Sequence, residues 1–145
     1  MVRTFLALVV GALAAAGMTL ARHDEHDRAK PTVKTLSASD IAEKIDGKKA
    51  RATTVEVTLG PGEASAPHRH PGPVFGYVLE GEYEWAIDDL PAKVLKAGET
   101  FYEPTGCLHR VSASPAGAQG QTRVLAVMLH PRDAKELSIP DLKKE

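Results

Sequence analysis

The sequence predicts an all-β fold, an antiparallel sandwich or barrel, from two observations. The first is a two-residue hydrophobic period from Arg51 onward, where Thr54–Leu59 alternates polar and apolar residues as a half-buried strand does. The second is the spacing of turn-forming residues, which separate short strand-like runs every eight to twelve residues. Together these patterns are typical of sandwiches and barrels.

Turn signals bound the predicted strands in order along the chain. Gly60–Gly62 ends the first strand, Glu80–Glu82 separates two central strands, and Ala97–Glu99 precedes a later one. Short helices are predicted outside the strands at Ser39–Gly47, with a capping residue and a final glycine, and at Asp133–Leu137. The predicted strands cover residues 54–59, 65–70, 74–79, 83–87, 93–95, 100–102, 109–111 and 123–129.

The first 21 residues are predicted to be a secretory signal peptide. Arg3 supplies a positive start, and the 18 residues Thr4–Ala21 carry no charge and are rich in Ala, Leu and Val. An uncleaved membrane anchor is the alternative, because this length is near the lower limit for spanning a bilayer. The many Ala and Gly residues favour cleavage after Ala21. We therefore expect a periplasmic or secreted protein with no stable membrane insertion after processing.

The predicted domain organisation is a signal peptide (1–21), a polar tail (22–34) and one folded domain (35–145). His23 and His26 lie among acidic residues of the tail, where a metal-binding role is the less favoured interpretation. Removing residues 1–21 removes Arg3 and no acidic residue, which leaves 17 basic and 19 acidic side chains and a net charge of −2. That balance gives no electrostatic reason to expect nucleic acid as a partner. Cys107 is the single cysteine, so the fold has no intrachain disulfide.

Three histidines are placed as metal ligands. His68 and His70 are one residue apart in Pro67–Pro71, so on a strand both side chains face the same side. Imidazole is the commonest metal-binding side chain near neutral pH, which makes this pair half of a metal site. His109 lies on a later segment and completes the site only if the sheet curls round.

These histidines lie in two motifs that resemble those of the cupins. The resemblance covers about Val55–Leu129 and implies a double-stranded β-helix (jelly-roll) barrel of the small single-domain bacterial type. It further implies a metal ion inside the barrel mouth, held by His68, His70 and His109. The motifs read Gly62-x5-His68-x-His70 followed by Gly81, and Gly98-x5-Pro104-x-Gly106-x2-His109.

The sequence departs from the cupin pattern at the fourth ligand. The first motif usually supplies a glutamate four residues after the second histidine, where this chain has Val74, and Ala113 stands where an asparagine often follows the last histidine. Three neutral imidazoles leave the metal charge uncompensated and suit zinc, while three-histidine cupins resemble diketone and thiol dioxygenases that use iron. The predicted cofactor is therefore a divalent cation (Zn, Fe, Mn, Cu or Ni). Alternation places Gly76 and Val78 beside Val74, as an apolar, roomy wall suited to an organic ligand.

Four other side chains with polar or reactive groups lie in or near the motifs. Glu103 and Tyr102 are candidates for acid–base or hydrogen-bonding groups at the mouth, but Glu103 precedes Pro104 and is predicted to lie in an exposed loop. Cys107 is either a soft metal ligand or a small buried residue, and the second is favoured. His130 is predicted to face solvent at a strand end.

Two apolar stripes run along the central strands. The first is interpreted as core or subunit interface, and the second, on the face opposite Val74, as sheet packing or a homodimer contact. The first stripe consists of Tyr83, Trp85 and Ile87, and the second of Phe75, Tyr77 and Leu79.

Three functions are compatible with these observations. The favoured hypothesis is an exported metal-binding cupin that binds or acts on a small organic ligand, with no catalytic residue assigned, because no serine, lysine or second carboxylate is identifiably paired with the histidines as a general base. The alternative is a metal-dependent dioxygenase of the three-histidine type, acting on a diketone, flavonoid or thiol-like substrate. The third is a barrel whose site has decayed, against which the intact histidine spacing argues.

Overall fold

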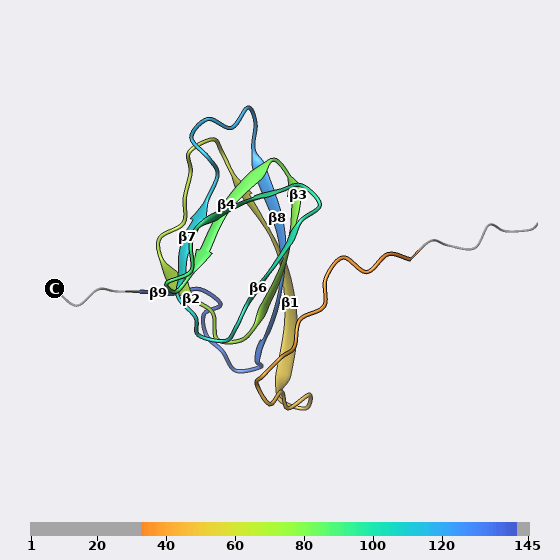
Figure 1. The fold of residues 1–145 in the computed structure, drawn as a ribbon. Coiled ribbons are helices and arrows are strands. Elements are labelled where there is room, and N and C mark those ends of the chain that lie inside the picture. The colour runs from red at the N-terminus through yellow and green to blue at the C-terminus, as the bar shows by residue number, and fades with distance from the viewer. Residues whose placement is uncertain (1–32, 142–145) are drawn as a thin grey trace, which may run out of the picture. The chain divides into compact units, whose positions relative to one another are not determined.

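The structure is a computed structural model that describes residues 33–141. These residues form two antiparallel β-sheets and contain no helix, which confirms the all-β prediction (Figure 1). The strands are β1 (Ala50–Leu59), β2 (His68–Arg69), β3 (Val74–Glu80), β4 (Glu82–Ile87), β5 (Lys93–Lys96), β6 (Thr100–Glu103), β7 (His109–Ala113), β8 (Thr122–Pro131) and β9 (Ile139–Pro140).

The strand order defines a double-stranded β-helix. One sheet has the order β1-β8-β3-β6 and the other the order β5-β4-β7-β2-β9. After the β4–β5 hairpin the chain alternates between the two sheets, because β6 and β8 belong to the first and β7 to the second. The longest ladder joins β1 to β8 over ten residues, from Ala50↔Pro131 to Leu59↔Thr122. The jelly-roll barrel that the motifs imply is therefore present.

The strands match the prediction with two differences. The run predicted over residues 65–70 pairs only at His68–Arg69, since Pro67 and Pro71 on either side have no backbone N–H to donate to a ladder. The second difference is β9, which pairs with β2. It occupies a C-terminal stretch for which the sequence predicts only a short helix nearby.

Both predicted helices are wrong. Residues 39–46 are extended or bent and a turn follows, with Ile41 and Ile45 more than a third exposed. An isolated helix of this length is marginal without a packed apolar face. Glu43, within the segment predicted as helix, accepts a hydrogen bond from the Thr105 N–H at Oε1 (2.7 Å). Residues 133–137 form turns and bends, and the Leu137 carbonyl contacts His70.

The core lies between the two sheets. The stripe Tyr83, Trp85 and Ile87 is buried there against Val78 and Val124, which confirms its core assignment. The second stripe lies on the outer face of β3 and is half-buried. The outer face therefore keeps apolar side chains that the core does not use.

The motif glycines are required by backbone conformation. Gly62, Gly81, Gly98 and Gly106 all have φ between 71° and 93°, a region that side-chain-bearing residues rarely adopt. At Gly81 a Cβ atom would also come within 2.6 Å of the Gln121 carbonyl oxygen. These glycines set the turns that place the motif histidines.

Some predictions fall outside the described residues. The signal peptide and most of the polar tail, including His23 and His26, precede residue 33. Across residues 33–141 the structure has no helix of the length and apolar character needed to cross a bilayer.

Candidate metal centre

The barrel brings the three predicted histidines together. His68 on β2 lies directly opposite His109 on β7, and His70 follows β2. The ring centroid of His68 is 4.8 Å from that of His70 and 5.0 Å from that of His109. One candidate ligand atom from each residue lies within 4.8 Å of the others. The sheet therefore curls as the metal hypothesis requires.

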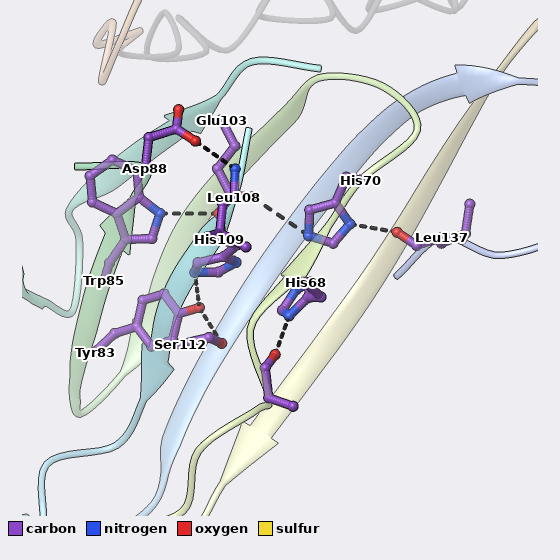
Figure 2. A network of polar contacts seen from close by, with 11 residues as sticks. His68, His70, Tyr83, Trp85, Asp88, Glu103, Leu108, His109, Ser112 and Leu137 are labelled. Carbon is purple, nitrogen blue, oxygen red and sulfur yellow. Dashed lines mark hydrogen bonds and ion pairs between the residues drawn. The ribbon is translucent and has the colours of Figure 1, made fainter. Parts of the chain in front are cut away.

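Backbone carbonyls orient the first two imidazoles. His68 Nδ1 lies 2.7 Å from the Ala66 carbonyl oxygen, and His70 Nδ1 contacts the Leu137 carbonyl oxygen. Because a carbonyl can only accept, each Nδ1 carries the proton and each Nε2 keeps its lone pair (Figure 2). Metal-binding histidines are commonly fixed in this way by a partner on the other ring nitrogen.

Glu103 lies inside the site, and the prediction that it occupies an exposed loop is wrong. It is the last residue of β6 and is 1% exposed. Its Oε2 lies 3.5 Å from His70 Nε2, and its Oε1 lies 3.2 Å from His109 Nδ1. The Trp85 Nε1–H donates to Glu103 Oε1 at 3.0 Å. Pro104 ends the strand after Glu103, so the alternation that turns Phe101 inward turns Glu103 inward as well.

The carboxylate missing at Val74 is present on the neighbouring strand. Val74 on β3 and Glu103 on β6 are cross-strand partners, and both line the same cavity. Directly opposite residues of an antiparallel pair project to the same face. The inward row Phe101–Glu103 was the sequence signal that could have located this carboxylate.

Burial sets the protonation of the site. It lowers the pKa of His109 to about 3, with His68 and His70 adding repulsion, and it lowers the pKa of His70. Burial raises the pKa of Glu103 to about 7, against the opposing effect of the Trp85 hydrogen bond. The His70 and His109 imidazoles are therefore neutral at pH 7, the state that binds metals.

Two buried polar atoms at the centre have no hydrogen-bond partner. They are Glu103 Oε2, which lies 3.5 Å from His70 Nε2, and His109 Nδ1, which lies 3.2 Å from Glu103 Oε1 without forming a hydrogen bond. Leaving such atoms unpaired costs about 1–3 kcal/mol each, and a cation bound beside the carboxylate oxygen and the three imidazoles would satisfy them. The donor set, three imidazole nitrogens and one carboxylate oxygen, fits a divalent transition metal.

Two further contacts position His109, and the sequence did not reveal either. The Tyr83 hydroxyl lies 3.4 Å from His109 Nε2 and 2.8 Å from Ser112 Oγ. Asp88 adopts φ 44° and accepts the Leu108 N–H at its carboxylate (2.8 Å), which holds the residue before His109. Tyr83 was predicted as core alone, whereas its hydroxyl faces the site (Figure 2).

A cavity of about 330 Å³ opens onto the three histidines. Its wall is apolar at Val74, as predicted. The wall is not open at Gly76, since a Cβ atom there would lie 2.0 Å from the Phe101 ring, which fills the space. Most of the remaining lining is also apolar, from Val55, Val57, Phe101, Val124, Ala126, Met128 and Leu137.

Three other candidates lie apart from the histidine group. Cys107 is buried in the core, as predicted, and burial raises the pKa of its thiol to about 12. Tyr102 faces outward and packs against Phe75, with ring centroids 5.3 Å apart, so its predicted place at the mouth is wrong. The predicted exposure of His130 is wrong too. His130 continues the inward row of β8 after Met128 and is 5% exposed. Its Nε2 lies 2.8 Å from the Thr53 hydroxyl.

The fold and the site define a cupin. A family model for the cupin domain matches residues 55–128, and the chain belongs to this family. No curated protein was found to match the chain.

Solved structures share the fold at low identity. The polyketide cyclase RemF from Streptomyces resistomycificus is 24% identical (TM-score 0.52), with 68% of this chain covering 66% of that one. The DMSP lyase DddQ from Ruegeria pomeroyi is 20% identical (0.50; 68% and 47%). Oxalate decarboxylase from Bacillus subtilis is 18% identical (0.54; 65% and 25%). The chain therefore spans less than two thirds of each of these proteins.

Proposed function

We propose that this cupin holds a divalent metal ion through His68, His70 and His109 and binds a small organic ligand beside it. The proposal rests on one observation. The three imidazoles lie together, and two buried atoms among them and beside them, His109 Nδ1 and Glu103 Oε2, have no hydrogen-bond partner. Such atoms are costly in an empty fold and are satisfied by a cation.

The cavity supports the organic ligand. Its volume of about 330 Å³ lies at the lower end of the range for small-molecule sites, and its walls are mainly apolar. A bound metal ion supplies Lewis acidity to an oxygen or sulfur atom of the ligand. Val74 and Met128 exclude water around that atom, and the Tyr83 and Ser112 hydroxyls offer hydrogen bonds near His109.

Metal analysis of the purified mature protein tests the metal site. We expect one equivalent of divalent metal in the wild type and none in a His68→Ala/His109→Ala variant. The matched control is His23→Ala/His26→Ala, which removes two histidines from the polar tail and should keep the full equivalent. Loss in the tail variant with retention in the barrel variant would place the metal elsewhere and refute the proposal.

A dioxygenase that acts on a diketone, flavonoid or thiol-like substrate is the second candidate. The opening of the three histidines onto an apolar cavity favours it, because an organic substrate would lie next to the metal. The three solved structures that share the fold are named as a cyclase, a lyase and a decarboxylase, so the fold alone does not identify a reaction. Oxygen uptake by iron-loaded protein with each substrate class tests this candidate, and no uptake would leave the binding function.

The proposal extends to export and assembly. Cleavage after Ala21 would deliver the barrel to the periplasm or the medium, and N-terminal sequencing of the mature protein should begin at Arg22. We propose a homodimer through the outer face of β3 and β6, where Phe75 packs on Tyr102. Light scattering measures that mass directly, and a monomer at micromolar concentration would refute the dimer.

A further inference from the structure

We propose that Glu103 is the fourth protein ligand of the metal ion, a carboxylate supplied by β6 across from Val74. This inference rests on the proposed metal-binding function and deepens it. The site then has three nitrogens and one oxygen, although Val74 stands where the first motif usually supplies a carboxylate. One negative charge compensates part of the metal charge that three imidazoles alone would leave.

The first argument is position. Glu103 approaches from the side of His70 and His109, with its two oxygens 3.5 Å and 3.2 Å from their ring nitrogens. The group of three ligand atoms within 4.8 Å of one another does not include Glu103, whose carboxylate borders that group. Its cross-strand partner Val74 has no atom that can bind a metal.

The second argument is that the two carboxylate oxygens of Glu103 have different surroundings. The Trp85 Nε1–H holds Oε1 at 3.0 Å, which fixes the plane of the carboxylate. Oε2 has no hydrogen-bond partner although the side chain is 1% exposed. Carboxylates that bind a metal commonly accept a hydrogen bond at one oxygen while the other oxygen faces the metal.

The third argument excludes a purely structural acid–histidine pair. Such a pair would join His109 Nδ1 to the carboxylate by a hydrogen bond, yet Nδ1 lies 3.2 Å from Glu103 Oε1 without forming one, and Glu103 Oε2 has no partner either. A buried carboxylate that lacks a compensating charge is strongly destabilising. A metal ion satisfies both atoms at once.

The test compares Glu103→Gln with Glu99→Gln in the full mature chain. Glutamine keeps an oxygen for the Trp85 bond and loses the charge, and Glu99 is an exposed glutamate of the same motif. The readouts are Co²⁺ affinity by chelator competition and the visible absorption spectrum of the Co²⁺ protein. We expect Glu103→Gln to weaken binding by at least about tenfold and to change the spectrum, with Glu99→Gln unchanged.

A transposition variant adds a gain-of-function arm. Val74→Glu/Glu103→Val returns the carboxylate to β3 and should bind Co²⁺ more tightly than Glu103→Gln. Circular dichroism verifies folding, and if the double variant does not fold, Glu103→Gln decides alone.

The outcomes separate the two proposals. Unchanged affinity in Glu103→Gln, or weaker binding with an unchanged Co²⁺ spectrum, overturns Glu103 as a ligand and leaves the three-histidine site standing. Failure of the wild type to bind more Co²⁺ than His68→Ala/His109→Ala overturns the metal site itself.

Discussion

Two cross-strand pairs face each other across the barrel, and they differ in what makes them recognisable. His68 and His109 pair between β2 and β7, and both belong to sequence motifs. Val74 and Glu103 pair between β3 and β6, where the motif position carries the apolar residue and its partner carries the carboxylate. The residue spacing within the two motifs reveals the first pair, whereas only strand register reveals the second. A carboxylate can thus stand on either of two cross-strand partners and still face the same site.

The largest effect is expected when both members of the second pair are acidic. Val74→Glu places a second buried carboxylate directly opposite Glu103, where like charges repel. We expect the metal-free variant to lose about 3–5 kcal/mol of unfolding free energy at pH 8, as measured by urea denaturation with a chelator present.

The control for that variant is Leu90→Glu, which introduces a glutamate at a half-exposed position in the bend after β4. It should change stability by less than about 0.5 kcal/mol. An equally small loss in Val74→Glu would contradict the register that places position 74 opposite Glu103.

Gly76 on β3 and Phe101 on β6 are cross-strand partners two residues along the ladder from this pair. A smaller loss of stability is expected when Gly76 gains a side chain. In Gly76→Ala the new methyl group meets the Phe101 ring at 2.0 Å, so the ring must shift. We expect a loss of about 2–3 kcal/mol, measured by thermal unfolding. Gly47→Ala, with no atom within 4 Å of the new Cβ, is the near-neutral comparison. Equal melting temperatures for the two variants would contradict the packing.

Trp85→Phe sharpens the comparison through pH. Removing the indole N–H takes away the hydrogen bond that lowers the pKa of Glu103, so this pKa rises further above about 7. A pKa raised by folding favours stability at low pH and loses it as pH rises through the folded-state value. The metal-free variant should therefore be destabilised by about 1–2 kcal/mol, more at pH 8 than at pH 5. A loss that is equal at both pH values would mean that the indole acts by packing alone.

The smallest effect concerns the wall that carries His109. Cys107 is buried, and burial together with the nearby Glu103 and Asp88 charges raises its thiol pKa to about 12. Because the thiolate is the reactive form, a disulfide reagent should react slowly with native protein at pH 8 and rapidly in denaturant. Equal rates would contradict the buried thiol.

The parts of the fold that the sequence predicted are those encoded locally. Alternation located the strands, and the motif glycines with positive φ located the turns that place the histidines. Glu103 was missed because its inward orientation depends on where β6 ends, and Pro104 beside it indicated a loop. His130 was missed for the same reason at the end of β8. The helix predicted at Ser39 failed because capping signals alone do not stabilise a segment that packs on nothing.

The C-terminal strand links the site to weakly held backbone. β9 pairs with β2 over two residues, and the Asp141 N–H adds one bond to the Pro67 carbonyl, whereas β1 and β8 pair over ten residues. Opening so short a ladder costs little free energy and withdraws the Leu137 carbonyl from His70. Amide exchange should therefore be much faster at Asp141 than in the middle of β8. We expect the breathing of this strand to set how quickly an ion or ligand enters and leaves the barrel.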